Sequence, residues 1–508
     1  MIPLFNFNQW IDQNIGTITW EQVESWFVFD IQKPLLFNSA LFLGLFLVFY
    51  FFYILTQKTH RLRIAYVVAF SLFFYYKSSG IFFLLIIFSS VLDYVIAKLI
   101  YEEEDNFYRR FYLVVSLVVN LGLLGYFKYT NFFIDNTNLL FDRNFEFQDI
   151  ILPVGISFYT FQTLSYTIDV YRKELEPTKS FMDFLFFVSF FPQLVAGPIV
   201  RASDFIPQIY KRLNLTKEEF NTALFLIIGG LLKKAVISDY ISINFVDRVF
   251  DAPNSYTSFE NLMASYGYAI QIYCDFSGYS DMAIGLALLM GFWLPPNFRT
   301  PYQSTSVTEF WRRWHISLSS WLRDYLYISL GGNRKGKFRT YVNLFLTMLL
   351  GGLWHGASWK FVFWGVLHGL ALAVERYFGM FIKLPKNYFV RTIQVFLTFH
   401  FVAFCWLFFR AKDFHTAFEI MFNIGEMTFN PQQWLIIAQG YQNVFLLIAI
   451  GFIWHFLPNN IIKLLQKGFD ATPLVGKAIV LAFVYWIVYA TASAGPRPFI
   501  YFQFLKIY

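Results

Sequence analysis

Long apolar runs recur along almost the whole of this sequence, and no other feature restricts its fold as strongly. Several of them reach the ~20 residues that a helix needs to cross a lipid bilayer. Of the 508 residues, 57% are hydrophobic and only 14% are charged, whereas a soluble domain has roughly 25% charged residues. We therefore predict an all-α polytopic membrane protein.

The spacing of the apolar runs predicts roughly eleven to thirteen membrane segments. The first covers residues 35–55 and the last covers 476–492. The two longest stretches, 262–294 and 341–374, are each expected to contain two segments or a broken helix. Because no internal repeat or linker divides the chain, we interpret residues 1–508 as a single membrane-embedded domain.

Basic residues in the short loops indicate the orientation of the chain. The leader 1–33 has one basic residue against four acidic ones, whereas basic residues follow the first, third and fifth apolar runs. We therefore expect an extracytoplasmic N-terminus and a cytoplasmic loop at 299–339.

The loop 299–339 is strongly cationic, with eight basic residues against Glu309 and Asp324. Its tryptophans and tyrosines have helix-like spacing, which is typical of amphipathic helices at the membrane interface. Guanidinium groups bind phosphate in a bidentate manner, so the arginines suit an anionic ligand. The alternative is that they only set the topology. The candidate donor-binding residues are Trp311, Arg312, Arg313, Trp321 and Arg323.

The best candidate for a catalytic group is His355, in the sequence Leu353-Trp354-His355-Gly356. An ionisable residue at membrane depth is a functional hypothesis by default. A helix from Arg339 would carry His355 roughly 24 Å inward, where burial favours the neutral imidazole that accepts a proton. Nearby glycines suggest that the helix ends there. The alternative is a histidine that only bonds a neighbouring helix.

Three further sets of residues could contribute to a site. His315 lies within the cationic loop, where it either shapes the site or transfers a proton. Asp275 and Asp281 lie in an apolar segment, where they could bind a cation or, more simply, hold a broken helix by accepting backbone hydrogen bonds. Tyr501, in the apolar C-terminal tail 495–508, is by physical reasoning alone an interfacial anchor, although it could be a nucleophile.

Several common catalytic signatures do not occur. The sequence has no G-x-S-x-G, G-x-x-x-x-G-K-[ST], H-E-x-x-H or C-x-x-C motif, which argues against a serine hydrolase, a P-loop pump and a zinc peptidase. Nothing in the sequence supports a metal, a bound cofactor or a nucleic-acid partner.

Five stretches of the sequence resemble the membrane-bound O-acyltransferase family, and within it the alginate O-acetyltransferase branch. The resemblance extends from about residue 30 to the C-terminus, with its most family-like core at about 150–410. The matching stretches are residues 161–166, 197–201, 275–281, 311–330 and 351–356.

The resemblance implies roles for individual residues. In the family, the histidine of the Trp-His-Gly motif is the essential catalytic residue, which corresponds to His355. A second position, often histidine or asparagine, corresponds to His315. A C-terminal Phe-x-Tyr-Phe-x-Phe motif in related systems is thought to carry the acyl group on its tyrosine, so the resemblance favours Tyr501 as an acyl carrier. Asp275, Asp281, Asp324 and Trp354 would shape the site.

The resemblance also implies a fold and a reaction. The fold would be a ring of helices around a thinned centre that contains a tunnel. Acetyl-coenzyme A or another acyl thioester would be the cytoplasmic donor, and an SGNH-type acyltransferase outside the cytoplasm would pass the acyl group to an exported polysaccharide. We expect a multi-pass protein of the inner membrane, in contact with its lipids.

Alternatives remain at two levels. Within the enzyme class, the acceptor could be an alginate-like polysaccharide, peptidoglycan or teichoic acid. In a different class, the histidines could line the path of a transporter or a lipid flippase, but paired broken helices in corresponding halves are absent from the sequence.

Overall fold

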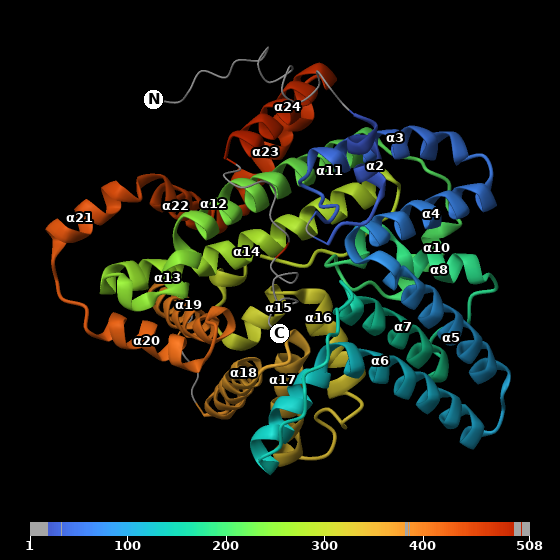
Figure 1. Ribbon diagram of the computed structural model, residues 1–508, viewed down its shortest axis with the longest axis horizontal. Helices are drawn as coiled ribbons and strands as arrows, with labels where there is room; N and C mark the ends of the chain where they lie inside the picture. The colour runs from blue at the N-terminus through green and yellow to red at the C-terminus, as the bar shows by residue number, and fades with distance from the viewer. Residues whose placement is uncertain (1–18, 32, 382–384, 386, 492–498, 500–508) are drawn as a thin grey trace.

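The computed structural model describes residues 19–31, 33–381, 385, 387–491 and 499. All regular elements of these residues are helices, and the described ranges contain no strand (Figure 1). The predicted all-α class is therefore confirmed.

The N-terminal third forms one group of helices on the right of Figure 1. A buried polar cluster joins three of them, because Asp93 of α5 accepts hydrogen bonds from Ser116 (2.5 Å) and Asn120 (2.9 Å) of α6 and from Thr167 (3.2 Å) of α7. Such bonds hold helices together in a membrane, where an unpaired polar group is costly. The group consists of α2 (Trp20–Phe27), α3 (Ala40–Thr56), α4 (His60–Ser79), α5 (Phe83–Glu102), α6 (Asn106–Phe141), α7 (Ile156–Tyr171) and α8 (Phe181–Ser189).

The centre of the molecule is α14 (Ser258–Leu289), which packs against α11 (Lys217–Leu231) and the π-helix η2 (Leu232–Ser238). The helix α14 begins with a capping box between Thr257 and Glu260 and continues without a break. The stretch 262–294 therefore contains a single helix, which ends at Leu289, where two segments or a broken helix were expected.

The prediction that Asp275 and Asp281 hold a broken helix is wrong. Asp275 instead forms an ion pair with Lys234 of η2 (2.5 Å), and Asp281 forms one with Lys233. Lys234 also contacts Asp239 (2.7 Å). Inside a regular helix the backbone amides are already bonded, so a buried carboxylate must find its partners among other side chains, which here are lysines.

The C-terminal half wraps around α14. Its longer elements are α15 (Val307–Arg313), α16 (Ile316–Trp321), the π-helix η6 (Leu322–Tyr327), α17 (Lys337–His355), α18 (Trp359–Phe378), α19 (Tyr388–Arg410), α20 (Phe414–Gly425), α21 (Pro431–Gly440), α22 (Gln442–Phe456), α23 (Asn459–Ala471) and α24 (Leu474–Thr491). The short connecting elements are η1 (Gly80–Phe82), α9 (Phe191–Leu194), α10 (Ala202–Ile209), α12 (Asp239–Ile241), η3 (Ser242–Val246), α13 (Asp247–Asp251), η4 (Pro253–Ser255) and η5 (Pro301–Gln303).

By length and composition, six helical stretches of the described residues can cross a membrane, or seven if the bent pair α21 and α22 counts as one span. The chain is thus a multi-pass membrane protein with fewer such helices than the eleven to thirteen expected. One reason is helix length: the apolar segments at 150–170 and 181–199 form α7 and α8, which have only 16 and 9 residues. A helix that crosses a bilayer needs about 20 residues.

Candidate functional site

The site is built on the hairpin of α17 and α18. The two helices pack closely along their length, and Gly352 makes the approach possible. A Cβ atom at this position would lie 2.3 Å from the carbonyl oxygen of Phe361 and 3.0 Å from the Cα atom of Gly365, which is closer than carbon atoms pack. The helix α17 ends at His355, and the extended backbone of Gly356 follows, as the glycines around His355 indicated.

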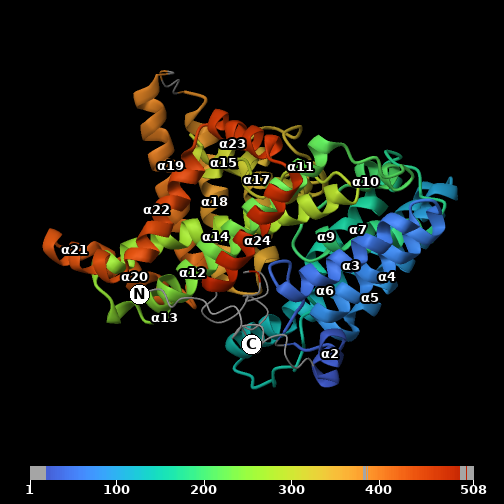
Figure 2. The same ribbon diagram turned by 90° about the horizontal axis from the view of Figure 1, so that it is seen from above.

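Two cavities lie at opposite ends of this hairpin. We call them the His355 cavity and the cationic cavity. The His355 cavity is lined by the turn 354–358, whereas the cationic cavity is lined by Glu375 near the other end of α18. In Figure 2, α15 lies toward the upper edge of the molecule, and the teal segment that follows α6 lies at the lower edge.

The His355 cavity is small and mostly apolar, with a volume of about 100 Å³. Its polar side chains include Lys128, Ser157, His355 and Ser358, and among the described residues no carboxylate lines it. Phe499, from the end of the chain, also lines it. Lys128 is therefore the only formal charge that the described side chains bring to this cavity.

The cationic cavity is much larger, about 990 Å³, and lies where the cationic loop meets α14. Its charged lining residues are Lys233, Arg299, Arg312, Arg313, Asp281, Glu309 and Glu375. Arg313 pairs with Glu309 (2.6 Å), and Lys233 pairs with Asp281. Within the described part of the chain, the side chains of Arg299 and Arg312 form no ion pair, so their guanidinium groups remain available for an anion.

His355 is enclosed by aromatic rings. Its imidazole lies 5.1 Å from the rings of Trp354 and Trp364 and 5.3 Å from that of Phe409, measured between centroids. Only 5% of the residue is exposed. Burial lowers the pKa of His355 well below 6.5, and the nearby basic groups lower it further. The imidazole is therefore neutral near pH 7 and can accept a proton.

His315 lies on the other side of Trp354. Its ring is 6.2 Å from that of Trp354 and 4.6 Å from that of Phe276. It is fully buried, and among the described residues neither ring nitrogen has a hydrogen-bond partner. Burial lowers its pKa to about 3. The backbone of His315 is left-handed, with φ of +43°, where it precedes α16.

The structure divides the five candidate donor-binding residues. Only Arg312 and Arg313 line the cationic cavity. Trp311 donates from Nε1 to Nδ1 of His368 (3.2 Å). Trp321 stacks on Phe161 with ring centroids 3.7 Å apart and donates to its carbonyl oxygen (2.8 Å). Both tryptophans thus pack between helices and do not line the cationic cavity.

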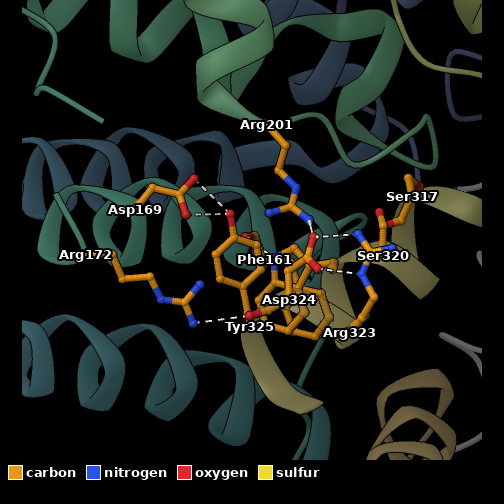
Figure 3. Close-up of polar contacts among 10 residues, drawn as sticks. Phe161, Asp169, Arg172, Arg201, Ser317, Ser320, Arg323, Asp324 and Tyr325 are labelled. Atoms are coloured by element: carbon orange, nitrogen blue, oxygen red, sulfur yellow. Dashed lines mark hydrogen bonds and ion pairs between the residues drawn. The ribbon is translucent and has the colours of Figure 1, made fainter. Parts of the chain in front are cut away.

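Arg323 belongs to a separate polar cluster, which Figure 3 shows. Asp324 forms ion pairs with Arg323 and with Arg201, each at 2.6 Å. Although burial opposes it, the contacts with these two arginines lower the pKa of Asp324. The hydroxyl of Tyr325 donates to Asp169 (2.8 Å). The cluster thereby connects α7 and the chain before α10 to η6, away from the cationic cavity.

The segment 295–340 is more deeply buried than an interfacial helix would be. Trp314, Trp321 and Tyr325 are 3%, 7% and 6% exposed, so these rings form part of the protein core. Tyr501 lies outside the described residues. Phe499, two residues before it, is 1% exposed and packs against Phe276 and Tyr279 with ring centroids 5.1 Å from each.

Comparisons with known proteins show which family the chain belongs to. Residues 172–414 match the model of the membrane-bound O-acyltransferase family. A probable alginate O-acetylase of Pseudomonas putida is 40% identical over 415 residues, which cover 77% of this chain and 84% of that protein. This chain belongs to the membrane-bound O-acyltransferase family. It is accordingly an acyltransferase.

Other relatives of this O-acyltransferase carry different acceptor names. A peptidoglycan O-acetyltransferase of Helicobacter pylori is 40% identical over 76% of the chain and 79% of its own length. A teichoic acid D-alanyltransferase of Bacillus subtilis is 31% identical over 53% of the chain and 71% of its own length.

The sequence did not reveal one polar residue of the candidate site. Lys128 of α6 lines the His355 cavity and donates to the carbonyl oxygen of Trp354. The available signal was a charged residue directly after the apolar run 111–127. That signal was ambiguous, because a lysine at the end of a run usually marks the membrane surface.

Proposed function

We propose that this O-acyltransferase transfers an acetyl group from a cytoplasmic thioester, acetyl-coenzyme A, to an exported polysaccharide of the alginate type. The observation that carries the proposal is the position of His315 and His355. Both are buried beside Trp354, with His355 at the end of α17 and His315 directly before α16. The hairpin of α17 and α18 has the cationic cavity at one end and the His355 cavity at the other.

The cationic cavity supports the choice of donor. Coenzyme A carries several phosphates, and guanidinium groups bind phosphate through charge-assisted, bidentate hydrogen bonds. Arg299 and Arg312 line the cavity without an ion pair in the described structure, so they can make such bonds without first breaking others. We assign phosphate binding to these two residues, with Arg313 held by Glu309 beside them.

His355 supplies the proposed chemistry. As a neutral base, it accepts the proton of the attacking hydroxyl while the hydroxyl oxygen forms a bond with the thioester carbonyl carbon. The carbon–sulfur bond then breaks, and the thiol leaves with the proton returned by the imidazolium. His315, two rings away across Trp354, shapes the space in which this step takes place.

The C-terminal tail supports a carrier role for Tyr501. Phe499 is fixed in the His355 cavity, and Tyr501 follows it by two residues. Two residues of chain span at most about 7 Å. We propose that the hydroxyl of Tyr501 accepts the acetyl group first and passes it to an SGNH-type partner outside the cytoplasm.

We also propose that the protein lies in the inner membrane, with the N-terminus outside the cytoplasm and the cationic cavity on the cytoplasmic side, as the basic residues of the loops indicate. Peptidoglycan is the second candidate acceptor, because the Helicobacter pylori relative is as similar to this chain as the Pseudomonas putida protein. Hydrolysis of the purified polymers and measurement of released acetate distinguish the two.

Replacement of His355 tests the proposed mechanism. The variant His355→Ala should lose O-acetylation of the exported polymer by about 10²- to 10⁴-fold, which is the usual contribution of a general base. His400→Ala is the matched control, since this histidine bonds Tyr266 on α14 and lines neither cavity. Acetate content that stays at the wild-type level in His355→Ala, with normal amounts of protein in the membrane, would overturn the mechanism.

A further inference from the structure

The last turn of α17 presents His355 and needs partners for its backbone. The final four carbonyl groups of a helix receive no hydrogen bond from an N–H group of the same helix. In this structure two of them are bonded by neighbouring residues of α6. The hydroxyl of Tyr129 donates to the carbonyl oxygen of Leu353 (2.8 Å), and Nζ of Lys128 donates to that of Trp354.

Lys128 joins three helices at this point. Besides the carbonyl oxygen of Trp354 on α17, its ammonium group donates to the hydroxyl of Ser157 in the first turn of α7 (3.2 Å). It also lies 5.5 Å from the centre of the Trp354 ring. Lys128 therefore contacts both the backbone and the side chain of the residue that directly precedes His355.

Lys128 is a basic residue in apolar surroundings, which is unusual for a residue that only stabilises the structure. Most of α6 is exposed apolar surface, because only 17% of its most apolar window is buried. No described carboxylate lines the His355 cavity to balance the cation. A charge in a membrane helix is costly and marks a functional position by default. A neutral hydrogen-bond donor at this position could bond the helix end without the free-energy cost of burying a charge.

We propose that Lys128, supported by Tyr129, is a positioning residue that holds the end of α17 so that His355 faces the reacting atoms. The inference rests on the proposed catalytic role of His355. Lys128 acts through the carbonyl of Trp354 and needs no contact with the donor phosphates, which bind at the other end of the hairpin. Loss of Lys128 should therefore lower kcat and leave KM for the donor unchanged.

The first test uses Lys128→Met, which keeps the length of the side chain and removes its charge and donors. Membrane vesicles that contain the full chain and its host partners are given radiolabelled acetyl-coenzyme A, and label in the polymer is measured per mole of folded enzyme. We expect kcat to fall about 100-fold, as a misplacement of about 1 Å can cause, with KM within about twofold. Lys477→Met is the matched control, because Lys477 is a buried lysine that donates to the carbonyl of Asp470 and lines neither cavity.

The second test restores the ammonium group chemically. In Lys128→Cys, alkylation with 2-bromoethylamine forms a thioether with loss of bromide and places an amine at the lysine position. The natural cysteines, Cys274 and Cys405, are both buried, so the new thiol in the cavity reacts selectively. We expect alkylation of the folded variant to recover most of the lost kcat, whereas alkylation with iodoacetamide should not.

The outcomes separate this inference from the proposed function. If Lys128→Met keeps kcat within about threefold while His355→Ala is inactive, the positioning role is wrong and the function stands. If His355→Ala is itself active, the mechanism beneath both proposals is wrong. If Lys128→Met is poorly folded, the alkylation experiment decides, because an unchanged kcat after alkylation of folded Lys128→Cys also overturns the role.

Discussion

The cavities at the two ends of the α17 and α18 hairpin differ in how many charged side chains line them. The cationic cavity gathers seven charged side chains, and two of its arginines remain unpaired among the described residues. The His355 cavity has one cation, Lys128, among rings and backbone. The first environment suits a large anionic donor, whereas the second suits a neutral base and an acyl group. In the proposed mechanism, donor binding and chemistry are therefore separated along one helix pair.

Among the changes that test this comparison, removal of the hydroxyl of Tyr501 is expected to have the largest effect on acetylation of the exported polymer. Tyr501→Phe should reduce acetylation of the exported polymer to background, because the nucleophilic oxygen is lost. Phenylalanine retains the aromatic contact, so an anchor would keep working. Mass spectrometry of the C-terminal peptide should show an acetyl adduct on Tyr501 in the wild type and none in His355→Ala.

The other tyrosine of the tail provides the control for this test. Tyr508→Phe changes the same functional group seven residues further on and should acetylate the polymer normally. Normal acetylation by Tyr501→Phe, together with the absence of any adduct, would show that the tyrosine is an anchor and that the His355 cavity transfers the acyl group without it.

Replacement of His315 should have an intermediate effect. His315→Ala is expected to lower kcat by about 10- to 100-fold, less than His355→Ala, because the ring shapes the site from behind Trp354. Steady-state rates in membrane vesicles check this. A loss as complete as that of His355→Ala would mean that His315 takes part directly in proton transfer.

Charge removal in the cationic cavity should have the smallest effect. Arg312→Gln should raise KM for acetyl-coenzyme A about tenfold, because a charge-assisted contact of about 1.5 kcal/mol is lost. Arg323→Gln serves as the matched control, since Arg323 pairs with Asp324 outside the cavity. The effect of Arg312→Gln should shrink as salt is added. Equal KM values for the two variants, independent of salt, would mean that the loop only sets the topology.

Local sequence patterns were sufficient for some of these features. The apolar runs predicted the all-α membrane class, and the glycines around His355 predicted where α17 ends. Both features depend on neighbours in the chain. The distance from Arg339 placed His355 correctly at the far end of its helix, because helix rise is constant.

The features that the sequence did not reveal depend on contacts between distant segments. The ion pairs of Asp275 and Asp281 require lysines of η2 that lie 41 and 48 residues earlier in the chain. Arg312 and Arg323 look equivalent in the sequence, yet only one lines the cationic cavity. Lys128 is separated from Trp354 by 226 residues, and no spacing rule predicts which lysine reaches a given carbonyl.

The left-handed backbone of His315 has a consequence for how this position can change over evolutionary time. A positive φ disfavours β-branched residues and is tolerated best by glycine, asparagine, aspartate and histidine. Of the first three, only asparagine combines an uncharged side chain with both a donor and an acceptor, as the neutral imidazole of histidine does. The backbone conformation thus limits which residues can replace His315 during evolution, and it gives a physical reason why histidine and asparagine would alternate here.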